Sequence, residues 1–338
     1  MRCGADCESW HTHLIRRPDV SRVIALVGPT GVGKTAVSIE LAQLIGAEVV
    51  SCDAMQVYRD MAILTQAPTS AQRRQVSHYL VECVDSTETF NAGQYRRMAI
   101  PLINRLLERG KNVLIVGGTG LYLKALREGL CEAPPSDSKT REALWRECSG
   151  LGSVTLHNRL QTVDSPAALR IHPNDARRII RALEVFALTG RPLSQWWKSP
   201  PAQVLREPIL VVGLNRERSE LYARIHQRLL HMVYEEGVIN EVRRLLRSTL
   251  SLTARQVHGL ADIEKYLSGQ VSLKDALCVW QQRVRNYAKR QVTWFRHVPG
   301  IEWIDVTDDV RAWQIAERIE NLIRRMELSS VIMDTTPV

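Results

Sequence analysis

The chain has 338 residues, and 45% of them are hydrophobic. Its 45 Lys and Arg residues against 36 Asp and Glu residues give a net charge of +9. This charge would attract a polyanion such as nucleic acid, without specifying which one. This length and composition predict two globular domains, or one with a large insertion, and they exclude a membrane-spanning protein because no apolar run approaches the roughly 18 residues of a spanning helix. Seven scattered cysteines without a CxxC pair support neither a zinc ribbon nor a disulfide framework, and they favour a reducing cytoplasm.

The first half of the chain alternates short strands with helices. Residues 22–28 form an apolar, β-branched run that ends at a glycine, and residues 34–45 follow as a segment compatible with a helix. The alternation continues with apolar or helical runs at 48–51, 79–84, 91–109 and 112–116. It predicts an α/β fold with a mostly parallel sheet covered by helices on both faces.

The middle of the chain lacks strand-like runs. Helical segments flanked by Pro134-Pro135 and Pro200-Pro201 predict an inserted, all-helical subdomain. The strand pattern is expected to return at 208–214, followed by helices at 218–247, 272–296 and 310–325. The expected boundaries are a core of 21–133 and 205–327, a helical insertion of 134–204, and loose ends of 1–20 and 328–338.

An octapeptide after the first predicted strand matches the phosphate-binding pattern GxxxxGK[ST] in full. Its glycines let the backbone turn N–H groups toward phosphate oxygens, the following helix N-terminus adds partial positive charge, and Lys34 adds a full charge. Thr35 is a candidate ligand for Mg²⁺. The pattern indicates a P-loop NTPase-like fold that binds an oligophosphate, without specifying a reaction. The predicted diphosphate- or nucleotide-binding residues are Gly28, Pro29, Thr30, Gly31, Val32, Gly33, Lys34 and Thr35.

Two aspartates follow predicted strands and are candidates for chemistry. Ligands of open α/β sheets bind beyond the carboxyl ends of the strands, so Asp53 should lie beside the phosphate cradle, where it could accept a proton or help to hold a metal. The alternative for Asp53 is the N-cap of a helix that starts near Met55. Asp85 resembles a weak Walker B residue, but a turn residue at the end of a strand is the favoured interpretation.

An arginine-rich helix is predicted to begin after Asn174 and to end at Gly190. Arg177 and Arg181 project from the side opposite its apolar face and could contact phosphates. A solvated face bridged by Glu184 would give the same pattern and is favoured by the charges alone. The apolar face consists of Ile179, Leu183 and Phe186.

Several further motifs stand in a fixed order after the P-loop and Asp53. They are VGGTGLYL at 116–123, IHPND at 171–175, RRIIRALEV at 177–185, YAKRQ at 287–291 and TWFR at 293–296. Together they are similar to the signatures of the bacterial tRNA dimethylallyltransferase family, also called the tRNA isopentenylpyrophosphate (IPP) transferase family. The resemblance covers about residues 21–300, and several motifs in the same order are far more specific than any one alone.

The resemblance implies transfer of a dimethylallyl group from dimethylallyl diphosphate to N6 of the adenosine at position 37 of the tRNA, directly 3′ of the anticodon. The acceptors would be tRNAs that read codons starting with U, and the product N6-(dimethylallyl)adenosine. The P-loop would hold the donor's diphosphate with Mg²⁺, and Asp53 would be the base at N6. The catalytic residues implied are Asp53, Lys34, Thr119 and Arg218. The tRNA-contacting residues implied are Asp53, Ala54, Met55, Gln56, Thr119, Arg141, Arg177, Arg178, Ile179, Ile180 and Arg181.

The same resemblance sets expectations for partners and location. The helical insertion would grip the anticodon stem-loop of tRNA, and the enzyme would be a cytoplasmic monomer without a membrane partner. The chain departs from the family pattern at Ala54, where Ser is usual, and at 64–68, which lack a Gly and a Lys. At 257–260 it keeps only the glycine of a Gly-Tyr pair. These departures predict unchanged core chemistry with altered affinity for tRNA.

Two other functions remain open. A small-molecule or nucleotide kinase would use the same P-loop for ATP and Asp53 as the base toward a hydroxyl, and it would turn over ATP rapidly with a small alcohol. A non-catalytic RNA-binding P-loop protein would bind tRNA through its arginines. Its binding would not change in an Asp53→Ala variant, and it would release no product.

Overall fold

The computed structural model describes residues 23–199 and 204–334, with side chains as far as residue 326. The loose extension expected over 1–20 lies outside the described residues. The chain forms two compact units. Unit 1 comprises the chain up to Thr89, Pro101–Gly118 and the chain from Glu207, and unit 2 comprises Phe90–Ile100 and Thr119–Arg206.

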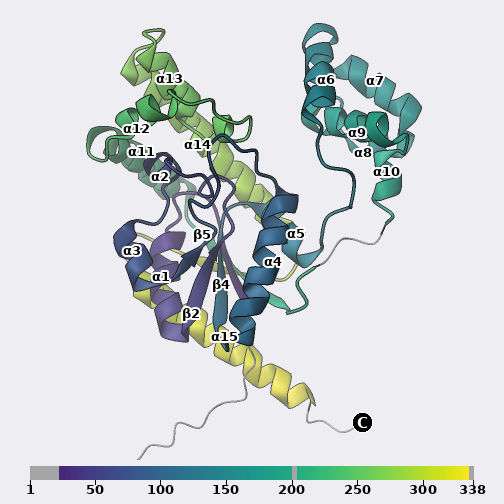
Figure 1. Cartoon of the computed structure of the whole chain (residues 1–338). Coiled ribbons are helices and arrows are strands. Elements are labelled where there is room, and N and C mark those ends of the chain that lie inside the picture. The colour runs from purple at the N-terminus through teal and green to yellow at the C-terminus, as the bar shows by residue number, and fades with distance from the viewer. Residues whose placement is uncertain (1–22, 200–203, 335–338) are drawn as a thin grey trace, which may run out of the picture. The chain divides into compact units, whose positions relative to one another are not determined.

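Unit 1 is built on a six-stranded sheet in which each pair of neighbouring strands is parallel (Figure 1). The strand order is β3-β2-β4-β1-β5-β6. Helices flank this sheet, which confirms the predicted α/β class. The strands are β1 (Val23–Val27), β2 (Ala47–Ser51), β3 (His78–Tyr79), β4 (Asn112–Gly117), β5 (Ile209–Asn215) and β6 (Ile301–Asp305).

The central strand β1 positions the loops that matter for function. All five of its residues are buried, as its apolar, β-branched sequence predicts. Its last residue, Val27, pairs with Gly117 of β4 and Gly213 of β5, while Ser51 of β2 pairs with Val116. Because these parallel strands end in register, the segments that follow β1, β2 and β4 all leave the same edge of the sheet.

Two strand predictions need correction. The run 79–84 was expected to be a strand, but β3 ends at Tyr79, because Leu80 and Glu82 adopt left-handed backbone angles of φ 57° and 47° that leave the strand region. Strand β6 was not predicted from the sequence. Its apolar residues Ile301, Trp303 and Ile304 form only a short run, and none of them is fully buried at this edge of the sheet.

The helices of unit 1 follow the predicted segments closely, with one break and one extension. The single helix expected over 218–247 is two helices, because Gly237 adopts φ 78° between them. The last helix continues to Asp334, into the tail that was expected to be loose from 328. The helices are α1 (Lys34–Ile45), α2 (Ala62–Thr65), α3 (Ser70–Gln75), α11 (Arg218–Tyr234), α12 (Val238–Leu245), the 3-10 helix η1 (Ala254–Gln256), α13 (Leu260–Leu267), α14 (Leu273–Arg296) and α15 (Ala312–Asp334). Helix α4 (Ala92–Glu108) begins in unit 2 and ends in unit 1.

Unit 2 is helical and has its own apolar core. Leu156, Leu160 and Leu183 are among the side chains buried in it. The arginine-rich helix starts one residue later than predicted, since the carboxylate of Asp175, and not the Asn174 side chain, accepts the capping hydrogen bond from Arg178 N. The helices of unit 2 are α5 (Gly120–Arg127), α6 (Ser138–Leu151), α7 (Ser153–Val163), α8 (Ser165–Arg170), α9 (Ala176–Thr189) and α10 (Leu193–Trp196).

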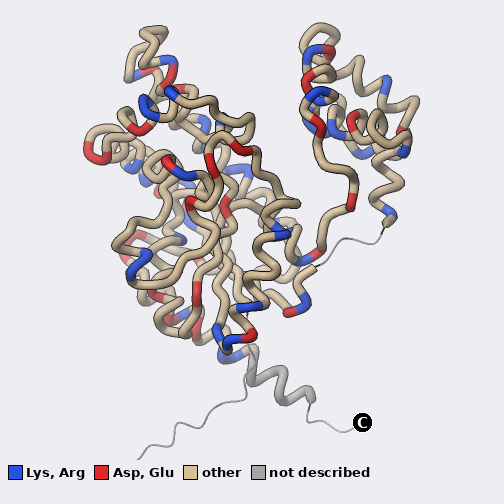
Figure 2. Tube along the Cα trace, in the orientation of Figure 1, with Lys and Arg blue, Asp and Glu red and all other residues tan. Residues whose placement is uncertain are grey.

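Charge and cysteine placement are also visible in the structure. Lys and Arg occur throughout both units, interspersed with Asp and Glu (Figure 2). None of the five cysteines within the described residues forms a disulfide bond. None of the helices described is long and apolar enough to cross a bilayer.

Gly117, the last residue of β4, is required by close packing. A Cβ there would lie 2.0 Å from the carbonyl oxygen of Cys52, which follows β2. We expect Gly117→Ala to lower the free energy of unfolding by about 1–3 kcal/mol, because backbone must move to relieve the overlap. Thermal and urea unfolding would measure it. As a control, Gly150→Ala in α6 meets no neighbour within 4 Å and should be neutral or slightly stabilising. Equal stability of the two variants would contradict this account.

Candidate active site

The P-loop forms a cradle at the end of β1. Gly28, Gly31 and Gly33 adopt φ values of 147°, 86° and 110°, which glycine reaches without a steric penalty. Gly33 is the N-cap of α1, so the free N–H groups of the helix start face the cradle. Lys34 Nζ donates hydrogen bonds of 2.9 Å to the carbonyl oxygens of Gly28 and Pro29. The ammonium group is thereby held over the loop.

Two arginines from α11 join the cradle. Arg228 Nη2 donates a 2.9 Å hydrogen bond to Thr30 Oγ1, and Arg224 Nε donates a 3.1 Å bond to the carbonyl oxygen of Gly31. The sequence analysis did not assign these arginines, although their i, i+4 spacing on a helix is readable. Arg218, which it did assign, lies at the start of α11, donates a 3.1 Å bond to Tyr222 Oη and stacks on that ring. Arg218 lines neither cavity described below.

The cradle holds more positive charge than its surroundings favour. Burial lowers the pKa of Lys34 to about 8, although the nearby Asp53 carboxylate opposes the shift. Burial also lowers the pKa of Arg228 to about 10, with repulsion from Arg224 as the next cause. The Nε of Arg228 finds no hydrogen-bond partner among the residues described. Half-buried cations and an unpaired donor are groups that a multiply charged anion would satisfy.

Asp53 follows β2 and stands beside the cradle. Its Oδ1 accepts hydrogen bonds from the backbone N–H groups of Met55 at 2.9 Å and Gln56 at 3.4 Å. These bonds close a turn, and no helix follows, so the predicted alternative of a helix N-cap is wrong. Asp85 accepts from the N–H and hydroxyl of Thr87, which confirms the favoured interpretation as a turn residue.

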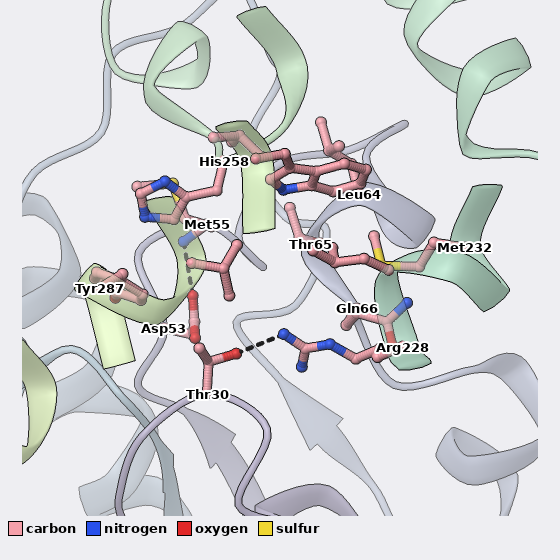
Figure 3. A pocket seen from close by; sticks show the side chains of 14 residues that line it. Thr30, Asp53, Met55, Leu64, Thr65, Gln66, Arg228, Met232, His258 and Tyr287 are labelled. Carbon is pink, nitrogen blue, oxygen red and sulfur yellow. Dashed lines mark hydrogen bonds between the residues drawn. The ribbon is translucent and has the colours of Figure 1, made fainter. Parts of the chain in front are cut away.

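Two cavities meet at Asp53. The larger has a volume of about 1030 Å³ and is polar, with Gly31, Lys34 and Thr35 of the P-loop in its wall. The smaller is drawn in Figure 3, where Arg228 reaches to Thr30 and Asp53 bonds to the Met55 amide. Its remaining wall consists of Leu64, Thr65, Gln66, Leu229, Met232, Val257, His258, Trp280, Val284 and Tyr287. The residues shared by both cavities are Thr30, Asp53, Thr65, Gln66 and Arg228.

Both stretches at which the chain departs from the family pattern, 64–68 and 257–260, contribute residues to the smaller cavity. Leu64 is buried there, and His258 packs against Tyr287 with 4.7 Å between ring centroids. Burial, together with the cationic Arg290 and Arg283, lowers the pKa of His258 below its ordinary value. The wall at this position is therefore an uncharged imidazole at neutral pH.

The remaining candidate residues lie in unit 2. Thr119 immediately precedes α5. Arg141 Nη2 and Arg181 Nη1 donate to the buried carboxylate Glu184, at 2.9 and 2.8 Å, so Glu184 bridges the arginines from inside the unit. Arg177 and Arg178 are exposed. Ile179 and Ile180, expected in the same tRNA-contacting stretch, have their side chains buried in the apolar core.

Comparisons with known proteins agree on one family. The model of the IPP transferase family matches residues 56–298. A tRNA dimethylallyltransferase from Syntrophobacter fumaroxidans is 45% identical over 85% of this chain and 84% of its own. One from Geobacillus thermodenitrificans is 40% identical over 90% of this chain and 95% of its own.

Solved structures give the same result. A tRNA isopentenylpyrophosphate transferase from Bacillus halodurans aligns with a TM-score of 0.65 at 36% identity, covering 92% of this chain and 99% of its own. A eukaryotic dimethylallyltransferase, described as acting on tRNA, aligns with a TM-score of 0.73 at 28% identity over 94% of this chain and 81% of its own.

Anion binding at the cradle should depend on pH through Lys34. Its lowered pKa of about 8 means that the charge is present below pH 8 and lost above it, so the affinity for inorganic pyrophosphate should fall as pH rises from 7 to 9. Calorimetric titration of wild type and Lys34→Met would isolate this effect. The affinity ratio of the two should shrink by up to about tenfold per pH unit above 8.

Lys124→Met provides the control for that titration. Lys124 is half-exposed and pairs with Glu128 on α5, in unit 2, so its removal should leave the pH profile of the wild type unchanged. A constant ratio between wild type and Lys34→Met from pH 7 to 9 would show that Lys34 does not supply the titrating charge.

Proposed function

Since the chain belongs to the IPP transferase family, we infer that it is a prenyltransferase that transfers a dimethylallyl group to transfer RNA. We propose that the donor is dimethylallyl diphosphate and that the acceptor is N6 of the adenosine 3′ of the anticodon. One observation carries the proposal: Thr30, Asp53 and Arg228 line both a polar, cationic cavity and a largely apolar one. A carboxylate thus stands where a diphosphate and a hydrocarbon group can meet.

The polar cavity binds the diphosphate of the donor. Backbone N–H groups of the P-loop, Lys34 and Arg228 surround the position where negative charge grows as the allylic C–O bond breaks, and they stabilise that charge. We assign to Arg228 the assisting role that the family resemblance suggested for Arg218, because Arg228 contacts Thr30 of the P-loop. Arg224, which contacts Gly31, adds a second guanidinium.

Mg²⁺ fits this cavity as a partner of the diphosphate. No cluster of three or more His, Cys, Asp or Glu side chains exists within the described parts of the chain, so no all-protein metal cage is present there. Mg²⁺ prefers few protein ligands together with phosphate oxygens, and Thr35 lines the cavity with a hydroxyl of the required kind. Thr35 would hold the ion, which would supply further charge neutralisation at the phosphates.

The smaller cavity receives the dimethylallyl group. Its Leu64, Met232 and Val284 side chains offer an apolar surface to the five-carbon chain, with Asp53 and Arg228 at the end that opens to the diphosphate. This division places the reacting carbon at the junction of the two cavities.

Asp53 acts as the base. The N6 lone pair of adenine is delocalised into the ring, so N6 is a weak nucleophile that benefits from proton removal in the transition state. The N6–C1 bond forms, the C1–O bond breaks, the N6 proton passes to the Asp53 carboxylate and diphosphate leaves. The two backbone amides that donate to Oδ1 orient the carboxylate for this task.

Unit 2 supplies the contacts to the anticodon stem-loop in this proposal. Arg177 and Arg178 are exposed for phosphate contact, and Glu184 orients Arg141 and Arg181. The acceptors are tRNAs that read codons starting with U. We further propose that the enzyme is cytoplasmic, where its tRNA substrate is found. We also propose that it works as a monomer, since both cavities are formed within unit 1 of one chain.

The two other functions have less support. A kinase acting on a small hydroxyl compound has no need for a mostly apolar cavity beside its base. An RNA-binding protein without activity has no need for a carboxylate at a cationic cradle. Neither of these two functions therefore explains why the polar and apolar cavities meet.

The role of Asp53 can be tested in Asp53→Asn, which keeps an oxygen acceptor for the Met55 amide but is no longer a base. With Mg²⁺, dimethylallyl diphosphate and unmodified tRNA, we expect kcat to fall by about 10²–10⁴-fold. Mass analysis of the nucleosides measures the product. Affinity for pyrophosphate should persist, which shows that the cradle is folded.

Asp85→Asn is the matched control, because Asp85 sits in a turn and lines neither cavity. It should retain wild-type turnover. Wild-type kcat in Asp53→Asn would remove this carboxylate from the mechanism, whereas tRNA binding without any product in the wild type would support the RNA-binding alternative.

The size of the smaller cavity should set the length of the prenyl donor. Leu64→Ala enlarges the apolar wall, and we expect the preference for the five-carbon over the ten-carbon diphosphate, as a ratio of kcat/KM values, to fall by about tenfold or more. Leu277→Ala is the control, since Leu277 lines a groove elsewhere on α14. An unchanged ratio in folded Leu64→Ala would place the prenyl chain elsewhere.

A further inference from the structure

Helix α14 carries a polar residue in its buried stripe. Ala276, Trp280, Val284, Ala288 and Phe295 follow helical spacing and are buried, and Gln291 occupies the same stripe with only 5% of its surface exposed. Burying an amide side chain is unfavourable unless its polar atoms are hydrogen-bonded. The bonds that Gln291 makes therefore explain its place in the helix.

Both ends of the Gln291 amide are used. Oε1 accepts a 2.8 Å hydrogen bond from the backbone N–H of Thr30 in the P-loop, and Nε2 donates a 2.8 Å bond to the carbonyl oxygen of Gly118 after β4. One partner is only a donor and the other only an acceptor, so the orientation of the amide is determined. One side chain thus links α14 to the loops that follow β1 and β4.

Gly118 is shaped for this contact. A Cβ at position 118 would lie 2.0 Å from Gln291 Nε2 and 3.4 Å from the carbonyl oxygen of Gly28. Only glycine lets the amide approach so closely. The second glycine of the VGGTGLYL motif is therefore the complement of the glutamine of YAKRQ, although 173 positions separate the two residues.

The residue that Gln291 holds stands at the centre of the site. Thr30 lines both cavities, and its hydroxyl accepts the hydrogen bond from Arg228. Arg228 is half-buried and its Nε has no hydrogen-bond partner among the described residues, so its position depends on few bonds. A displacement of Thr30 would move the acceptor that orients this guanidinium.

We propose that Gln291 is a positioning residue for the reaction: it fixes Thr30 and, through the Thr30 hydroxyl, Arg228 at the junction of the diphosphate and prenyl cavities. The proposal rests on the proposed function in one respect, namely that a diphosphate donor reacts at this junction. Gln291 touches neither substrate. Its effect reaches the donor through Thr30 and Arg228.

Two variants separate its two bonds. Gln291→Met keeps the length of the side chain and removes both bonds. Gln291→Glu retains an acceptor for Thr30 N but turns a carboxylate oxygen toward the Gly118 carbonyl, so that one bond is replaced by repulsion. Gln282→Met is the matched control, because Gln282 is exposed on the same helix and bonds only to Asn286 among the contacts described.

For the full-length Gln291→Met enzyme we expect kcat/KM for dimethylallyl diphosphate to fall by about 10–100-fold, since small misplacements at a reacting centre have effects of this size. The affinity for inorganic pyrophosphate should fall at least about fivefold, while KM for tRNA changes by less than about twofold. Gln291→Glu should lose a similar amount. Gln282→Met should match the wild type in all three measurements.

A double-mutant cycle with Thr30→Ala tests the route. Thr30→Ala keeps the N–H that Gln291 accepts but removes the hydroxyl that accepts from Arg228. If Gln291 acts through that hydroxyl, Gln291→Met should reduce kcat/KM far less in the Thr30→Ala background than in the wild type. A merely structural role would reduce kcat/KM by the same factor in both backgrounds.

Three results would overturn the proposal. The first is wild-type pyrophosphate affinity together with wild-type kcat/KM for the donor in folded Gln291→Met. The second is a cycle in which Gln291→Met lowers kcat/KM by the same factor in both backgrounds. The third is a loss that affects the kinetic parameters for donor and tRNA equally and matches the fraction of unfolded protein. Failure of the proposed function would look different. The wild type would then form no prenylated nucleoside, while pyrophosphate would still bind more weakly to Gln291→Met than to Gln282→Met.

Discussion

Positive charge that is partly removed from water is the constraint on which this molecule depends. Burial lowers the pKa values of Lys34 and Arg228; Asp53 opposes the fall at both residues, and Glu236 opposes it at Arg228. These carboxylates do not restore either pKa to its ordinary value, and the helix start at Gly33 adds partial positive charge. The site is therefore unfavourable when empty and favourable when a multiply charged anion fills it. In the proposed reaction the diphosphate gains negative charge as it leaves, so this positive charge would stabilise the transition state more than the ground state.

Polar side chains from helices that are distant in the sequence hold the segments around this charged site in place. Gln291 ties the P-loop to the end of β4, and Glu241 of α12 accepts hydrogen bonds from the N–H groups of Ile63 and Leu64 at 3.0 and 2.7 Å. Burial raises the pKa of Glu241, while these two amides oppose the shift. The carboxylate thus anchors the start of α2, whose Leu64 and Thr65 line the smaller cavity. The P-loop and α2 are thus each held by a buried polar side chain from another helix.

The parts of this site that the sequence predicts are those with local signals. The GxxxxGK[ST] pattern and the placement of Asp53 after an apolar run depend on neighbouring residues and on one rule for parallel sheets. Arg228, Gln291 and His258 depend on how α11, α13 and α14 pack, and Gln291 meets Thr30 across 261 positions. A local sequence pattern does not indicate which residues of distant segments will contact each other. The strand at Ile301–Asp305 was missed for another reason: its apolar residues Ile301, Trp303 and Ile304 form a run so short that periodicity alone does not identify it as a strand.

In unit 2 the positions of the two kinds of charge are reversed. There Glu184 is fully buried and accepts from Arg141, Arg181, Ser136 Oγ and the Asp137 amide, so a carboxylate lies inside and the cations lie partly in water. Its pKa is lowered by these hydrogen bonds and arginine charges in spite of burial. Because one carboxylate already restricts both arginine side chains, a phosphate that bound them would cause a smaller further loss of side-chain entropy. Unit 1 leaves charge unbalanced to bind a compact anion, whereas unit 2 balances part of its charge to hold long side chains still.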